Sequence, residues 1–459
     1  MQNTSSKWPK GIPYIIGNEA AERYSFYGMR AILIVFLASL MKEHAIVEES
    51  NAKATATFWV HIFIMATYAT GVIGALVSDI FWGKYRTIIN LSIVYCVGHF
   101  VLAFWETPEG FFWGCSLIAI GAGGIKPCVS AHVGDQFDAS NSHLIERMYN
   151  WFYFSINVGA IIAILSAEPI LKNPYLTEIG WNARIAFGLP GLLMLIALVV
   201  FYMGRKKYVS VKPIGWSIYK KQVFSKAGVS MIGRLMPFYI FLTIFWSLFD
   251  QTGTTWVTQA QSDLMTKTVD LGFFQFEFFP TQINVMNPLF VLLFIPLFTY
   301  VIYPRLGKVM PLTYFNKMLL GFIFAVLSFA LVSFIQVQLD HGYEISFLYQ
   351  IGAYVLLTSA EILISITSLE FSYTQAPKVL KSFVLSFWLL AIAVGNGFAA
   401  LINKLITKPI LENFIQSEHA SYFWFFTALM ALGSIGFYFV NRNYKQTMIL
   451  QEEKSSSTL

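Results

Sequence analysis

Twelve apolar stretches of about 20 residues constrain this chain more than any other feature. An α-helix needs about 20 predominantly apolar residues to cross the ~30 Å hydrocarbon core of a bilayer. Of the 459 residues, 56% are hydrophobic and 12% are charged, against about 25% charged in soluble domains. The stretches lack the two-residue alternation of membrane β-barrels. We therefore predict an all-α integral membrane protein with twelve transmembrane helices at 13–40, 56–79, 86–105, 110–132, 149–167, 183–204, 232–257, 284–303, 312–336, 347–373, 383–405 and 420–440.

Lysine and arginine are distributed unevenly among the connections between these stretches. With both termini placed in the cytoplasm, 19 of the 31 Lys and Arg residues fall on the cytoplasmic side, 7 on the outer side and the rest within helices. Cytoplasmic loops of membrane proteins carry an excess of these residues. The asymmetry predicts a multi-pass membrane protein with both termini in the cytoplasm.

The most basic connection divides the chain in two. We predict a six-helix bundle over 1–204, a basic cytoplasmic linker over 205–231, a second six-helix bundle over 232–442 and a disordered cytoplasmic tail over 443–459. Each half has a basic turn after its second helix, DIFWGKYR (79–86) and YPRLGKV (303–309). Such a weak internal sequence similarity is typical of transporters built from two repeated, pseudo-symmetric bundles. The linker is too short for an additional pair of helices between the halves.

The first apolar segment carries four charges, in NEAAERYSFYGMRAIL (18–33). A charge at the bilayer centre costs at least about 2.5 kcal/mol, so these side chains need partners. Glu19, Glu22 and Arg23 share one helical face, and Arg30 continues it. Glu19 can reach Arg23, and the cluster should face a cavity. A salt bridge that only locks helix packing is the alternative, but four charges exceed that need.

Further charges lie at compatible depths in other helices. Lys126 in the fourth helix falls in the same inner half as Glu22 and could pair with it. Arg30 and Lys126 are then spare cations of the first half, and Glu361 is a spare anion of the second. A zwitterion, with its carboxylate on one side and its amine on the other, fits this polarity.

Aromatic and amide side chains could complete a substrate cavity. Asn157 and Asn287 lie in mid-helix, where an unpaired amide would be costly, so they are candidates for recognising a peptide backbone. For each aromatic alone, lipid-facing or core packing is the simpler interpretation. The candidates are Tyr27, Tyr68, Tyr153, Trp246, Trp256 and Trp388.

His61 and Asp250 fall near the outer ends of the second and seventh helices. A His–Asp pair between the halves would titrate near physiological pH and could hold the outer side of the protein closed. A histidine that is merely satisfied at a helix interface is the alternative. Arg234 and Glu370 are also assigned as gate residues. Arg234 lies about 24 Å before Asp250 along one helix, so those two cannot pair without a break.

Five long motifs resemble those of the proton-dependent oligopeptide transporters, the POT or PTR family of the major facilitator superfamily. Glu19–Gly28 is similar to the family's ExxERFxYYG motif, with Phe26 in place of a tyrosine. The others are Gly123–Ala131 with Gly134–Phe137, Phe152–Gly159, Phe245–Gln251 and Glu370–Pro377.

The resemblance implies a major facilitator fold and symport of di- and tripeptides with protons. By analogy, Arg30 and Lys126 would hold the peptide carboxylate, and Glu361 with the two asparagines the amino end. Glu19, Glu22 and Arg23, with His61 and Asp250, would couple protonation to movement. The functional unit is expected to be a monomer in the lipid bilayer, with protons as coupling ion, no other cofactor and no nucleic-acid partner.

Other functions are disfavoured by the same residues. An enzyme would need a nucleophile–base pair or a metal cluster, and neither HExxH nor GxSxG occurs; the three cysteines have no metal-binding spacing. A channel or a sensor does not require two repeated halves around a charged centre. A carrier of nitrate, an amino acid or a peptide-like compound keeps the fold, but a nitrate carrier does not need Glu361.

Overall fold

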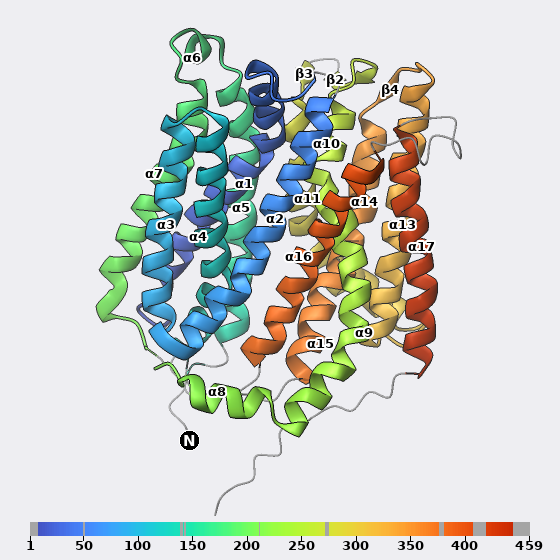
Figure 1. Ribbon diagram of the computed structural model, residues 1–459. Helices are drawn as coiled ribbons and strands as arrows, with labels where there is room; N and C mark the ends of the chain where they lie inside the picture. The colour runs from blue at the N-terminus through green and yellow to red at the C-terminus, as the bar shows by residue number, and fades with distance from the viewer. Residues whose placement is uncertain are drawn as a thin grey trace, which may run out of the picture.

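The computed structural model (Figure 1) describes residues 8–48, 51–137, 141, 144–210, 212–270, 275–375, 381–406 and 419–443. Within them, twelve helices are long and apolar enough to cross a membrane, which confirms the number predicted from the sequence. The tail predicted to be disordered lies almost wholly outside these residues.

The first six spanning helices form one bundle and the last six another, side by side in Figure 1. The first bundle holds α1 (Ile12–Glu43), α2 (Ala52–Val77), α3 (Lys84–Phe104), α4 (Pro108–Gly134), α5 (Ile145–Leu171) and α7 (Asn182–Met203). The second holds α9 (Lys226–Phe249), α11 (Met286–Leu297), α13 (Tyr314–Asp340), α14 (Leu348–Glu361), α16 (Lys381–Ile406) and α17 (Ala420–Asn443).

Short elements mark the two ends of the molecule. At the end called here the linker side, α8 (Trp216–Val223) runs beneath the bundles, after a short 3-10 turn, η4 (Gly204–Lys206). At the opposite end, the hairpin side, lie α6 (Pro174–Glu178) and two small sheets. The sheets pair β1 (Met265–Thr266) in parallel with β4 (Ile345–Ser346), and β2 (Thr268–Asp270) antiparallel with β3 (Gln275–Glu277).

Several spanning helices change their winding part-way. π-helical turns follow α2, α11 and α14, at η2 (Ser78–Trp82), η7 (Phe298–Ile302) and η8 (Ile362–Ile366); α12 (Tyr303–Leu306) and α15 (Thr367–Gln375) continue the last two. π-turns occur often at functional sites, and η8 begins directly after Glu361.

The seventh spanning helix, expected to be continuous, is broken. α9 ends at Phe249, a 3-10 turn η5 (Asp250–Gly253) follows, and Thr254 has non-helical angles (φ −132°, ψ −90°) before α10 (Thr255–Ala260). A second 3-10 turn, η6 (Pro280–Val285), precedes α11. Both turns bring backbone and side chains of the second bundle to the interface with the first.

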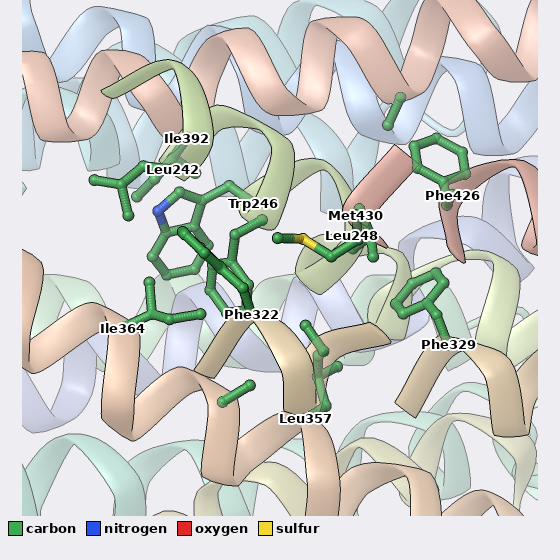
Figure 2. Close-up of a cluster of buried hydrophobic side chains, with 14 of the residues drawn as sticks. Leu242, Trp246, Leu248, Phe322, Phe329, Leu357, Ile364, Ile392, Phe426 and Met430 are labelled. Carbon is green, nitrogen blue, oxygen red and sulfur yellow. The ribbon is translucent and has the colours of Figure 1, made fainter. Parts of the chain in front are cut away.

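Each bundle has its own apolar core. Figure 2 shows that of the second, where Leu242, Trp246 and Phe322 lie together with Phe329 and Met430. In the first bundle, α2 and α4 approach so closely that a Cβ on Gly74 would lie 2.4 Å from the Cα of Gly124. Backbone contact through small residues is a common way for membrane helices to pack.

Candidate functional site

A cavity of about 280 Å³ lies between the two bundles. Ten residues proposed from the sequence for the site or the gate line it: Arg23, Tyr27, Arg30, Tyr68, Asn157, Trp246, Asp250, Asn287, Glu361 and Trp388. The lining combines Arg23 and Arg30 of the first bundle with Asp250 and Glu361 of the second. The roles of these residues in binding stay predictions.

The charged cluster of α1 is internally paired. Arg23 Nε lies 2.6 Å from Glu19 Oε1 and 3.2 Å from Glu22 Oε2. The two carboxylates are almost completely buried, at 2% and 1% exposure. The prediction that Glu19 reaches Arg23 is confirmed. This arrangement keeps both acids beside a cation in a region from which water is excluded.

Lys126 pairs with Glu22, as predicted, but it does not face the cavity. Its Nζ lies 3.5 Å from Glu22 Oε1 and 3.9 Å from the centre of the Phe26 ring. Among the described residues, Lys126 is not part of the cavity lining. The expectation of a spare cation facing the substrate is therefore wrong for this conformation, because Glu22 and the face of Phe26 hold the ammonium group.

Arg30 is not a spare cation either. Its Nη2 donates to Asp250 Oδ1 at 2.5 Å, across the boundary between the bundles. Gly253 lets η5 approach, since a Cβ there would lie 3.3 Å from Arg30 Nε. The sequence could not show this pair, because the break after α9 is what brings Asp250 beside α1.

The predicted direct pair of His61 and Asp250 is wrong, because Asn396 of α16 stands between them. His61 Nδ1 donates to Asn396 Oδ1 at 2.9 Å, and Asn396 Nδ2 donates to Asp250 Oδ2 at 2.6 Å. His61 Nε2 lies 3.0 Å from the hydroxyl of Thr254, which can donate to it. All these bonds fit a neutral imidazole protonated on Nδ1.

At the other wall, Asn287 fixes Glu361. Its Nδ2 donates to Glu361 Oε2 at 2.7 Å and to the Thr358 hydroxyl at 3.2 Å. The prediction that both residues belong to one site is supported by these contacts and by the cavity lining. Asn157 faces the same cavity and is buried.

The aromatic candidates divide between cavity and core. Trp246 and Trp388 meet edge to face at 5.3 Å, and Trp388 Nε1 donates to Ser368 at 2.9 Å. Trp256 is a correction: it is fully buried in the core of the second bundle, with its ring 4.9 Å from that of Tyr354.

Three other candidates stay predictions. The side chains of Tyr153 and Glu370 lie outside the described part of the structure. Arg234 is exposed on α9 and is not among the described residues that line the cavity.

Sequence reasoning missed a second contact between the bundles on the hairpin side. The buried carboxylate of Glu168, near the end of α5, accepts from Thr281 N at 2.9 Å and from the Thr281 hydroxyl at 2.5 Å through Oε2. Its Oε1 lies 2.6 Å from Lys172 Nζ. Beside it, Gln282 Nε2 donates to the carbonyl of Leu165 at 3.0 Å. An acid inside the apolar run AILSAEPIL (163–171) was the available signal.

The architecture and these motifs agree with one family model, described as "POT family", which matches residues 85–227 and 216–425. The chain belongs to the POT family.

Solved and curated relatives agree with this assignment. The POT family transporter PepTSo has a similar structure, with a TM-score of 0.84 and 35% identity over 95% of this chain and 98% of that chain. An auto-inhibited POT family peptide transporter has a TM-score of 0.83 and 32% identity, over 97% and 99%. Solute carrier family 15 member 2 of Homo sapiens is 34% identical over 73% of this chain and 50% of its own length. Peptide transporter family 1 of Drosophila melanogaster is 33% identical, over 73% and 48%. The chain thus spans about half the length of these curated relatives.

Proposed function

We propose that this chain is a proton-coupled symporter that imports di- and tripeptides across a cell inner (plasma) membrane by alternating access. The observation that carries the proposal is the charge arrangement of the cavity. Arg23 and Arg30 line it from the first bundle and Glu361 from the second. A free peptide presents a carboxylate and an ammonium group at a fixed separation, and two oppositely charged walls match that pattern. Relatives whose names state peptide transport support the substrate class.

The linker side is proposed to face the cytoplasm, together with both termini. The basic connection 205–226 and α8 lie there, in agreement with the positive-inside rule. Arg30–Asp250, His61–Asn396 and Glu168–Thr281 all join the bundles toward the hairpin side. In this orientation the structure represents a state closed to the outside.

Protonation is proposed to act on the paired cluster of α1. While Glu22 is ionised, it holds Arg23 and Lys126. A proton on Glu22 removes that attraction and frees a cation for the peptide carboxylate, while Glu361 binds the ammonium group. Rocking of the bundles then exposes the site to the cytoplasm. The protein works as a monomer, and the proton is its coupling ion.

The test is uptake of a labelled dipeptide into proteoliposomes under an acid-outside gradient. We expect accumulation that peptides with free termini inhibit strongly and that peptides with one blocked terminus inhibit only weakly, at higher concentration. Glu22→Gln should abolish accumulation but retain exchange of labelled for unlabelled peptide. Glu277→Gln, on the exposed strand β3, is the matched control and should accumulate peptide normally. Accumulation by Glu22→Gln under the imposed gradient would refute the coupling role.

A further inference from the structure

A third asparagine, which the sequence did not suggest, lines the cavity together with Asn157 and Asn287. Asn287 donates its amide hydrogens to Glu361 and Thr358. It is therefore occupied in orienting the carboxylate. Asn284 lies three residues earlier, in η6, and also lines the cavity. Three residues make about one turn of a 3-10 helix, so Asn284 sits about one turn closer to the hairpin side.

Tyr354 fixes the orientation of the Asn284 side chain. Its hydroxyl donates to Asn284 Oδ1 at 2.7 Å. Tyr354 is itself immobile, since it is fully buried and its ring packs 4.9 Å from that of Trp256. With Oδ1 engaged, Nδ2 is the free end of the amide, and the described part of the chain gives it no acceptor. An N–H₂ group in that position can donate to an oxygen in the cavity.

Contacts through η5 place Asn284 at the Arg30 end of the cavity. The Tyr354 hydroxyl lies 3.5 Å from the carbonyl of Thr252. The next residue, Gly253, faces the guanidinium of Arg30, which a Cβ would approach to 3.3 Å. Asn284 therefore belongs to the cationic end, where a neutral N–H donor adds a directed hydrogen bond to an anion.

We propose that Asn284 binds the carboxylate of the peptide together with Arg30, and that Tyr354 is its positioning residue. The proposal rests on the proposed function and adds a residue to it. The amide of Asn284 donates a directed hydrogen bond but carries no charge. It therefore favours a terminal carboxylate and does not affect the ion pair between Arg30 and Asp250. Tyr354 keeps the donor end of the amide turned toward the cavity.

The experiment measures binding of alanyl-alanine, its C-terminal amide and its N-acetyl derivative, by thermal stabilisation of the full chain in detergent without a proton gradient. Asn284→Ala should weaken binding of alanyl-alanine about 10-fold, as for loss of one hydrogen bond to a charged group. Asn284→Asp should weaken it further by repulsion. Asn441→Ala is the matched control; this residue bonds Asn316 on another part of the second bundle and should bind normally.

Comparing the effect of Asn284→Ala on the three peptides identifies the peptide group that Asn284 contacts. Asn284→Ala should have little effect on the C-terminal amide, whereas its effect should persist for the N-acetyl peptide. Tyr354→Phe should raise the half-saturation concentration for alanyl-alanine more than it lowers maximal transport, and should add nothing to Asn284→Ala. Equal effects on all three peptides would overturn the inference. If the wild type binds no dipeptide at all, the proposed function fails instead.

Discussion

Replacing Glu168 by Gln tests whether the hairpin side is held closed by a second contact, apart from Arg30 and Asp250. The carboxylate accepts two hydrogen bonds from Thr281 in the other bundle. Hydrogen bonds to a charged group contribute about 1.5–3 kcal/mol, and neutral ones about 0.5–1.5 kcal/mol. Glutamine retains an acceptor oxygen but not the charge, so each bond should weaken by about 1 kcal/mol. The nearby Lys172 is 43% exposed, and its ion pair adds little in that position.

Opening on the hairpin side separates α5 from η6, so the closed state alone loses this energy. About 2 kcal/mol shifts the equilibrium between closed and open forms by about 30-fold. Spin labels at Tyr175 and Tyr343, both exposed on this side in different bundles, would report the shift. In double electron–electron resonance, the long-distance population should rise in Glu168→Gln.

The controls separate this contact from a general loss of structure. Glu277→Gln should leave the distance distribution unchanged. Thr281→Val keeps the shape and the backbone N–H but removes one hydrogen bond to a charged group, which contributes about 1.5–3 kcal/mol, so it should produce a shift of similar size. The two changes together should be less than additive, because they remove one shared bond. A distribution in Glu168→Gln identical to wild type, in folded protein, would show that this contact does not hold the side closed.

Three further changes test other parts of the structure. Asn396→Ala should leave His61 and Asp250 without their shared partner and lower stability by about 1–3 kcal/mol, measured as a lower melting temperature in detergent. Trp256→Ala should cost about 3–5 kcal/mol by opening a core cavity, whereas Trp388→Ala should raise the half-saturation concentration for peptide with a much smaller loss of stability. Gly74→Ala should destabilise by about 1–3 kcal/mol, since the new methyl group forces α2 from α4; an unchanged melting temperature would contradict that close approach.

Spans and pairings within the first bundle could be predicted from sequence because each depends on short-range geometry. Glu19 and Arg23 meet because four residues make about one helical turn. Glu22 and Lys126 meet because their helices run in opposite directions and place both charges at one depth. Hydrophobic length and helical periodicity contain that information without any knowledge of the second bundle.

Contacts between the bundles could not be predicted in the same way. Asp250 pairs with Arg30 only because the helix breaks after Phe249, and the glycine at the break, Gly253, does not by itself distinguish a broken helix from a continuous one. Asn396 reads as an ordinary polar residue in an apolar helix until α16 packs against α2. Trp256 and Trp388 are chemically identical in the sequence, and only the path of the chain decides which enters the core and which lines the cavity.

In the proposed transport cycle, the pairing of Arg30 with Asp250 gives closure of the hairpin side a way to promote release of the peptide. Asp250 engages one nitrogen of the guanidinium, while Arg30 still lines the cavity. The cation can therefore contact a peptide carboxylate, but its charge is already largely neutralised in a region of low dielectric, where such compensation is strong. The same site should thus hold the carboxylate more weakly when the hairpin side is closed than when Asp250 has moved away. Asp250 and the peptide carboxylate thus compete for the same guanidinium group of Arg30. Closure of the hairpin side and weaker binding of the peptide then have one common cause.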